Sequence, residues 1–132
     1  MTHRYTLDTS AIMAYFLGEK EAKEVSDILF RVKKGEASVY VCFMSFMEVL
    51  YRTWRLSGED TGRRAYIMLR NLPVKEVRED EDLLLMASII KATCPLSVAD
   101  AWIVAAAQKT DSTLLHKDPE LNNLKAVKTR RL

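Results

Sequence analysis

The sequence predicts an α/β fold with three layers, α/β/α, in which helices cover both faces of a mostly parallel central sheet. Short runs rich in β-branched and aromatic residues alternate with longer runs of helical spacing, the pattern of parallel βαβ units. One longer run, residues 98–109, is apolar on nearly every side, as expected for an interior helix. With 132 residues, 48% of them apolar, the chain can bury a core, and we expect a single domain over residues 1–132.

The first half of the chain contains two strand-like and four helical runs. Gly35 and Pro73 mark the ends of two helical runs, because neither residue continues a helix well. The first helix is expected to begin at Thr9 or Ser10, since hydroxyl side chains favour helix starts. We therefore expect strands at 3–8 and 38–42, and helices at 9–17, 20–35, 45–56 and 60–72.

The second half continues the same alternation. Four acidic residues, 79–82, precede a helical run, and we interpret them as charges favoured by the helix dipole rather than as a metal site. Ser97 is a typical residue for starting the next helix. In a sheet of this kind, ligand sites open at the carboxyl ends of the strands. We expect strands at 74–77, 113–116 and 125–129, and helices at 80–93 and 98–109.

Four acidic residues stand inside apolar runs or at their ends. Asp8 ends the first predicted strand, Asp118 follows the strand at 113–116, and Glu48 and Asp100 interrupt otherwise apolar helical stretches. Burying a carboxylate in apolar surroundings costs several kcal/mol unless a partner offsets the cost. The sequence shows few obvious cations beside these acids, which indicates a metal ion as the partner.

The predicted topology brings these four acids to one edge of the sheet. Asp8 and Asp118 emerge at the carboxyl ends of strands, and the helices that carry Glu48 and Asp100 begin at the same edge. Four carboxylates gathered there would repel one another unless cations intervened. Oxygen ligands without His or Cys favour Mg²⁺ or Mn²⁺, so we expect one of these ions.

Three of the acids also have a purely structural interpretation. Asp8 could cap the first helix, Asp118 could hold the turn before Pro119, and Asp100 could interact with its helix dipole. Glu48 suits neither a cap nor a surface position. The four acids taken together, on one topology, favour the interpretation as a site.

These residues and motifs resemble the PIN domain family and, within it, the toxin nucleases of VapC type. The resemblance covers nearly the whole chain, and successive acids are 40, 52 and 18 residues apart, as suits such compact domains. The motifs that carry it are Asp8-Thr9-Ser10-Ala11, Ser45-Phe46-Met47-Glu48-Val49-Leu50, Ser97-Val98-Ala99-Asp100-Ala101 and the late strand that leads to Asp118.

The resemblance implies a divalent-metal-dependent endoribonuclease that hydrolyses RNA phosphodiester bonds with metal-activated water. It implies Asp8, Glu48, Asp100 and Asp118 as catalytic residues, with Asp8, Asp100 and Asp118 as metal ligands. Ser10 matches the hydroxyl residue that supports the first Asp, and Glu48 either binds a second ion or orients the water. The resemblance also implies a small antitoxin protein as partner and a homodimer.

Four further residues are candidates for contact with the substrate. PIN domains often have Thr or Ser two residues before the last Asp, where this chain has His116. His116 could contact the scissile phosphate, donate to a carboxylate, or have no catalytic consequence. Arg52, Arg55 and Lys117 could hold the RNA backbone, or could be ordinary solvated charges.

Some other functions are excluded and some stay open. A phosphatase of the haloacid dehalogenase type needs a second Asp where Ser10 stands, and motifs of P-loop, serine-hydrolase and zinc-protease enzymes do not occur. A DNA nuclease, a PIN nuclease of RNA processing or decay without an antitoxin, and a non-catalytic nucleic-acid-binding PIN module stay open. No segment suits a membrane span, and Cys42 and Cys94 look like buried thiols of a reducing cytoplasm, the expected location.

Overall fold

The central sheet has five parallel strands in the order β3-β2-β1-β4-β5. The computed structural model describes residues 2–132, so that only Met1 of the predicted domain lies outside the described residues. All four pairs of neighbouring strands are parallel, which confirms the predicted sheet. The strands are β1 (His3–Leu7), β2 (Ala37–Cys42), β3 (Lys75–Val77), β4 (Thr113–His116) and β5 (Thr129–Arg131).

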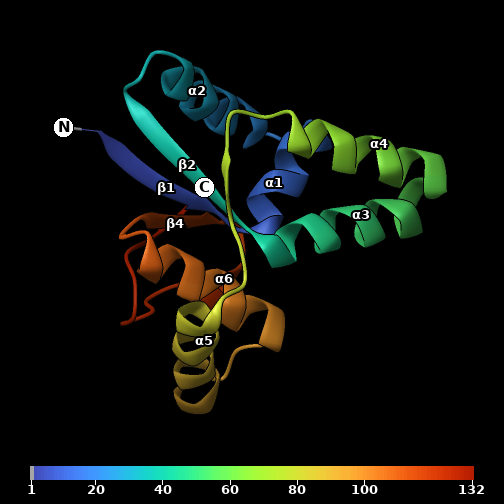
Figure 1. Cartoon of the computed structure of the whole chain (residues 1–132). Coiled ribbons are helices and arrows are strands. Elements are labelled where there is room, and N and C mark those ends of the chain that lie inside the picture. Colours follow the sequence, from blue (N-terminus) through green and yellow to red (C-terminus); the bar gives the residue numbers. More distant parts are fainter. Residues whose placement is uncertain (1) are drawn as a thin grey trace.

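Six helices cover the two faces of this sheet, as Figure 1 shows. They are α1 (Thr9–Phe16), α2 (Ala22–Lys33), α3 (Phe43–Ser57), α4 (Glu59–Arg70), α5 (Glu81–Thr93) and α6 (Val98–Lys109). Leu115 of β4 packs with α1 to α4, whereas its neighbour Leu114 packs with α5 and α6. Successive side chains of a strand point to opposite faces, and both faces here are buried under helices. The three-layer α/β/α prediction is therefore confirmed.

Helices α3 and α4 form a hairpin that extends beyond the sheet (Figure 1). Gly62 of α4 makes this close approach possible, because a Cβ atom there would lie 2.9 Å from the Leu50 carbonyl oxygen and from the Trp54 Cβ and backbone nitrogen. Only glycine fits so close to the backbone of a neighbouring helix. The contact fixes the outer half of α3 against α4.

The structure corrects some predicted boundaries. The last strand is Thr129–Arg131 rather than 125–129, because Ala126 and Val127 pack against the α6 face and pairing with β4 begins only at Thr129. Helix α3 begins directly after β2, two residues before its predicted start. Helix α1 begins at Thr9, one of the two predicted starts, and the Asp8 carboxylate caps it by accepting from the Ser10 backbone N–H.

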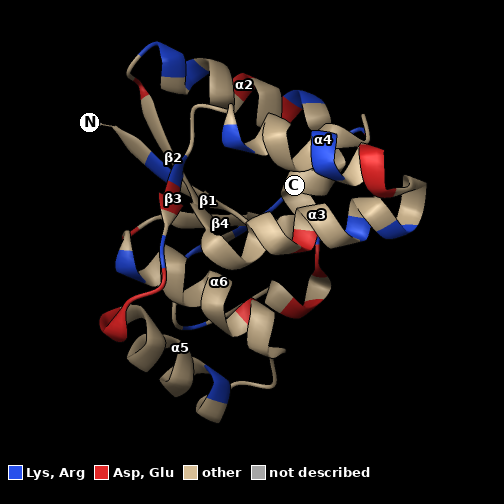
Figure 2. Ribbon diagram, turned by 45° about the vertical axis from the view of Figure 1, so that its right-hand side comes forward, with Lys and Arg blue, Asp and Glu red and all other residues tan. Residues whose placement is uncertain are grey.

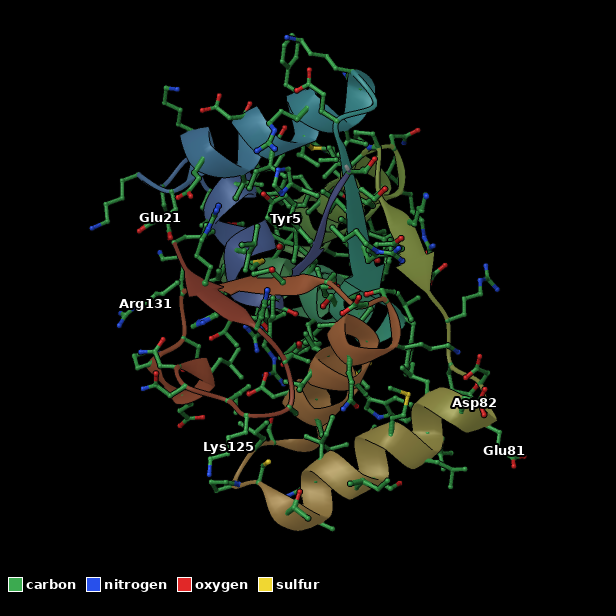
Figure 3. All side chains as sticks on the ribbon, turned by 90° about the vertical axis from the view of Figure 1, so that its left-hand side faces the viewer. Tyr5, Glu21, Glu81, Asp82, Lys125 and Arg131 are labelled. Carbon is green, nitrogen blue, oxygen red and sulfur yellow. The ribbon has the colours of Figure 1, made fainter. Side chains whose placement is uncertain are left out.

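The acidic run before α5 is a helix start, as predicted. The Asp80 carboxylate accepts from the Leu83 backbone N–H at 2.8 Å and pairs with Lys109. Figure 3 shows Glu81 and Asp82 at the start of α5, pointing away from the body of the molecule. These acids are exposed and stabilise the positive end of the helix.

None of the helices within residues 2–132 is long and apolar enough to cross a membrane. Both cysteines are free thiols. Cys42 is buried, and burial raises the pKa of its thiol to about 12. Cys94 is only half-buried, so the expectation of two buried thiols is wrong for this residue, which follows the last turn of α5.

Candidate active site

The structure brings the four predicted acids together at the carboxyl edge of the sheet. Asp8 follows β1 directly, Asp118 lies two residues after β4, Glu48 lies in the second turn of α3, and Asp100 lies in the first turn of α6. The negative charges of Asp8, Asp118 and Glu48 all raise the pKa of Asp100, which places the four groups within one electrostatic neighbourhood. In Figure 2, acidic segments of α3 and α6 lie close together, and basic segments follow along the outer half of α3.

Asp8 is buried and hydrogen-bonded within its own turn. Its side chain is only 4% exposed, and its Oδ2 accepts from the Ser10 backbone N–H at 3.1 Å and from the Ser10 hydroxyl at 2.5 Å. Burial raises the pKa of Asp8, and the charge of Glu48 raises it further. The residue therefore caps α1 and also presents a carboxylate whose charge is costly to bury.

Ser10 joins two strands at this edge. Its Oγ donates to Asp8 and accepts from the Lys117 backbone N–H at 2.9 Å, immediately after β4. The Asp8 backbone N–H in turn donates to the Leu115 carbonyl of β4 at 2.9 Å. The carboxyl ends of β1 and β4 are thus locked side by side, with Asp8 and Asp118 emerging from them.

Glu48 is buried, and both of its carboxylate oxygens have partners within the protein. It is 5% exposed, with Oε1 accepting from the Thr9 hydroxyl at 2.7 Å and Oε2 accepting from the Arg52 guanidinium at 2.8 Å. Few cations were expected beside the acids, and Arg52 is one that balances Glu48. The sequence indicated this ion pair, because Glu48 and Arg52 are four residues apart and therefore lie on one face of a helix. Thr9 and its partner Ser45, at 2.9 Å, are site neighbours that the sequence prediction did not assign.

The Asp100 carboxylate has no cationic partner comparable to Arg52 among the described residues. The Ser97 hydroxyl accepts from its backbone N–H at 3.1 Å and caps α6, but no Lys or Arg within residues 2–132 forms an ion pair with the carboxylate. Burial, together with the charge of Asp8, raises the pKa of Asp100 to about 6. A carboxylate in this state gains strongly from a bound cation.

Asp100 meets two other carboxylates in an arrangement that could hold a metal ion. One oxygen each from Asp100, Asp118 and Glu120 lies within 4.8 Å of the others. The Asp118 carboxylate accepts from the Glu120 backbone N–H at 3.0 Å, in a turn that brings Glu120 back to the site. Glu120 was not predicted, because its exposed position after Pro119 looks like an ordinary polar turn. Three carboxylates with oxygen donors only fit Mg²⁺ or Mn²⁺.

A comparison with protein families identifies the family to which this fold belongs. The model of the PIN domain matches residues 5–127 of the chain. The chain belongs to the PIN domain family. The resemblance noted in the sequence is therefore confirmed at the level of the family. The comparison with curated proteins found no significant match.

Solved structures with the same fold include several toxin–antitoxin proteins. A chain of VapBC2 from Rickettsia felis, bound to a promoter DNA fragment, matches with a TM-score of 0.77 at 8% identity, over 97% of this chain and 98% of that chain. DNA-bound VapBC from Salmonella typhimurium matches with a TM-score of 0.74 at 13% identity, over 99% and 98%. The sarcin-ricin loop cleaving toxin VapC20 from Mycobacterium tuberculosis matches with a TM-score of 0.64 at 16% identity, over 83% and 86%. At such identities the likeness shows the fold.

His116 is buried inside this PIN domain. The residue has 0% exposure, and neither ring nitrogen has a hydrogen-bond partner among the described residues. Burial lowers the pKa of His116, although the charges of Asp8 and Asp118 oppose this effect. The ring is therefore neutral near pH 7 and closed to solvent, which places it behind the carboxylates rather than at the surface that a phosphate would approach.

The three predicted backbone-binding cations of this PIN domain lie beside the acids, in different states. Arg52 is bound to Glu48, and Lys117 forms ion pairs with Glu19 and, at 3.3 Å, with Glu21. Arg55 has no carboxylate partner among residues 2–132 and lies over the Tyr51 ring, with its guanidinium carbon 5.1 Å from the ring centre. Arg55 is therefore the most available of the three for an anionic ligand.

Proposed function

We propose that this PIN domain is a divalent-metal-dependent endoribonuclease and the toxin of a type II toxin–antitoxin pair. The observation that carries the proposal is the convergence of Asp100, Asp118 and Glu120 within 4.8 Å, beside the buried Asp8, without a cation of the described protein to balance them. Like charges placed so close favour the binding of a cation. The arrangement suits phosphodiester hydrolysis, in which charge develops on phosphoryl oxygens.

In such a reaction, some residues would hold the metal ion and others would position the carboxylates. Asp8, Asp100 and Asp118 would hold Mg²⁺ or Mn²⁺, and Glu120, which converges with Asp100 and Asp118, would be a further ligand. A bound ion of this kind supplies a water of lowered pKa as nucleophile and neutralises charge on the phosphate. Ser10 holds Asp8 in place, and Thr9 and Arg52 hold Glu48, so that the carboxylates keep their positions when RNA arrives. The expected products are a 5′-phosphate and a 3′-hydroxyl.

The partner proteins of the proposed toxin are a small antitoxin and a second copy of the chain. Support for the antitoxin comes from solved structures of the same fold, which include VapBC toxin–antitoxin proteins. An antitoxin would present a basic side chain to the four acids. We place the protein in the cytoplasm, where its RNA substrate occurs. A PIN nuclease of RNA processing would share the site but would lack an adjacent antitoxin frame in the genome.

The direct test changes Asp8 or Asp100 to Asn and measures cleavage of single-stranded RNA with Mg²⁺ or Mn²⁺. We expect each change to lower the cleavage rate at least about 100-fold, as found when a group that stabilises developing charge is removed. Glu81→Gln, on the exposed start of α5, is the matched control and keeps full activity. Undiminished cleavage by both site variants would overturn the assignment, and matched DNA oligonucleotides would show whether the ribose is required.

A further inference from the structure

Two hollows lie beside α3, and both border the acidic site. The first, of about 590 Å³, is called the aromatic hollow and is lined by Met44, Met47, Tyr51, Trp54 and Arg55, with Glu48 and Ala99 toward the acids. The second, of about 660 Å³, is called the basic hollow and includes Arg52, Arg55 and Lys117, with Ser10 toward the acids. Tyr51 and Arg55 line both, so the two hollows meet along one stripe of α3.

The two hollows differ in chemistry. The aromatic hollow presents two rings and two thioether side chains, and Glu48 is its one acidic side chain. The basic hollow brings together the three cations beside the acids and the carboxylate of Glu19. Lys117 pairs with Glu19 and Arg52 with Glu48, so Arg55 is the cation of this hollow that has no carboxylate partner among the described residues. A single ligand that covers both must therefore have flat apolar groups on one side and negative charge on the other.

We propose that the aromatic hollow is a base-binding subsite, in which an unpaired base of single-stranded RNA stacks on Tyr51 and Trp54 while Arg55 in the neighbouring hollow contacts its phosphate. The proposal rests on the proposed ribonuclease function and names its substrate as single-stranded RNA. Stacking on aromatic rings and Arg planes is the usual way in which proteins hold unpaired bases. A base here lies next to Glu48 and Ala99, one residue from Asp100, and so places the adjoining phosphodiester at the acids.

The rings are accessible and already stack with planar cations. Trp54 is 41% exposed although it is a large apolar residue, and Tyr51 is half-buried. The Arg55 guanidinium lies over Tyr51, and the Arg63 guanidinium lies over Trp54 with its carbon 5.6 Å from the ring centre. A guanidinium and a nucleobase are both flat groups that stack on such rings.

The platform is also rigid before the ligand arrives. Gly62 of α4 presses against the backbone nitrogen and Cβ of Trp54, so the position of this residue on α3 is set by the helix hairpin. Little conformational freedom is then lost when a base stacks, which favours binding.

Charge favours RNA over a protein as the occupant of this surface. Arg55 has no carboxylate partner among residues 2–132, whereas Arg52 pairs with Glu48 and Arg63 with Glu59. A phosphate gains from a cation that no carboxylate already neutralises, which makes Arg55 the expected contact. Exposed Met47 and Leu56, at 63% and 67%, would also suit an apolar helix, and a protein occupant is therefore an outcome of the test.

The test measures the binding of a fluorescent oligoadenosine RNA to the full chain in EDTA, where metal-dependent cleavage does not interfere. We expect Tyr51→Leu and Trp54→Leu each to raise the Kd about 10-fold, the size found when one stacked base loses its ring. Tyr51→Phe restores most of the affinity lost in Tyr51→Leu, because the ring remains. RNA also quenches the fluorescence of Trp54, a signal that disappears in Trp54→Leu although Trp102 remains.

Two controls separate stacking from folding and from general charge. Phe30→Leu removes an aromatic side chain that is 59% exposed on α2 and lines neither hollow, and it leaves the Kd unchanged. A base-free ribose-phosphate oligomer of equal length binds about 10-fold more weakly to the starting protein, but not to Tyr51→Leu. Thermal unfolding of each variant shows that the fold is intact.

Three results would overturn the subsite. The first is absence of RNA binding in EDTA, and the second is equal RNA affinity of the starting protein and both Leu variants. The third is that the two Leu variants bind RNA normally but no longer bind an antitoxin, which would make the hollow a protein-docking surface. None of these is a failure of the proposed function, which fails only if metal-dependent RNA cleavage is absent or is unaffected by Asp8→Asn and Asp100→Asn.

Discussion

The two halves of the acidic site are held in different ways. Asp8 and Glu48, on the side of α1 and α3, are almost fully buried, and each has hydrogen bonds from the protein. Asp100 and Asp118, on the side of α6 and β4, are partly exposed and form no ion pair with the described part of the chain. In the first half, donors of the protein satisfy the carboxylates. In the second half, no Lys or Arg of the described residues pairs with them.

The difference teaches how one site can be both stable and reactive. A buried carboxylate is tolerated only when donors satisfy it, and Ser10, Thr9 and Arg52 do so here. Asp100 and Asp118 have no cationic partner among the described residues, and burial together with the charges of neighbouring acids raises the pKa of Asp100 to about 6. In the proposed metal site, the satisfied half would hold its carboxylates in place, and a bound metal ion would relieve the repulsion in the open half.

The largest effect is expected on metal affinity. Glu120→Gln removes one of three converging carboxylates, and we expect it to weaken Mn²⁺ binding about 100-fold, because even supporting partners of metal ligands contribute 10- to 100-fold. The measurement is the rise in unfolding temperature with Mn²⁺, compared with Asp118→Asn and with the remote control Glu81→Gln. Glu48→Gln should weaken binding less. If Glu48→Gln and Glu120→Gln weaken Mn²⁺ binding equally, the two halves do not differ in their contribution to the metal site.

The next effect is on the stability of the metal-free protein as a function of pH. Burial and neighbouring carboxylates raise the pKa of Asp100 from 3.8 to about 6, so that protonated Asp100 is favoured in the folded state. The unfolded chain releases this proton first as the pH rises, and stability therefore falls between about pH 4 and pH 6. Asp100→Asn should be more stable than the starting protein at pH 8 by about 2 kcal/mol, and equally stable near pH 3.5.

Urea unfolding in EDTA at the two pH values measures this difference. Mn²⁺ at pH 8 should stabilise the starting protein but not Asp100→Asn, because the released repulsion is the source of the gain. Equal stability of the two proteins at pH 8 would show that Asp100 is not strained in the folded state.

A smaller effect is expected in the satisfied half. Arg52→Ala leaves one oxygen of the buried Glu48 without its donor, and we expect a loss of about 1.5 kcal/mol in the free energy of unfolding. The loss is moderate because the Arg52 side chain is 44% exposed and water can replace part of the contact. Adding Glu48→Gln to Arg52→Ala should restore much of this stability. If the double variant loses the sum of both single losses, the two residues do not act as a pair.

Much of the fold could be predicted from local pattern. The bounds of α6 and β4 were predicted to the residue, because Ser97 starts the helix and each element has a mainly apolar centre that is buried in the layered fold. The last strand was placed too early, since the apolar Ala126 and Val127 resemble strand residues but pack on α6. Local composition does not distinguish pairing in a sheet from packing on a helix.

The site was predictable in its anomalies but not in its partners. Asp8, Glu48, Asp100 and Asp118 were recognisable because each stands inside an apolar run or at its end. Glu120 was not, because an exposed acid in a turn carries no signal until the turn folds back beside Asp100. The hollow lined by Tyr51 and Trp54 was not predicted either, since apolar residues of an amphipathic helix look alike whether they face the core or a hollow.

The smallest effect is expected at Ser10, which links the two halves. Ser10→Ala removes the hydroxyl that donates to Asp8 and accepts from the Lys117 N–H, and we expect a loss of about 1 kcal/mol of stability. Asp8 keeps the backbone N–H of residue 10, so its cap on α1 remains. Cleavage should fall about 10-fold, since Asp8 is then less well oriented. Ser88→Ala, an exposed hydroxyl on α5 that donates only to the Leu84 carbonyl, is the matched control in both measurements. A change in stability with no change in cleavage would show that Ser10 joins the strands without orienting Asp8, and the two halves would then be coupled through the backbone alone.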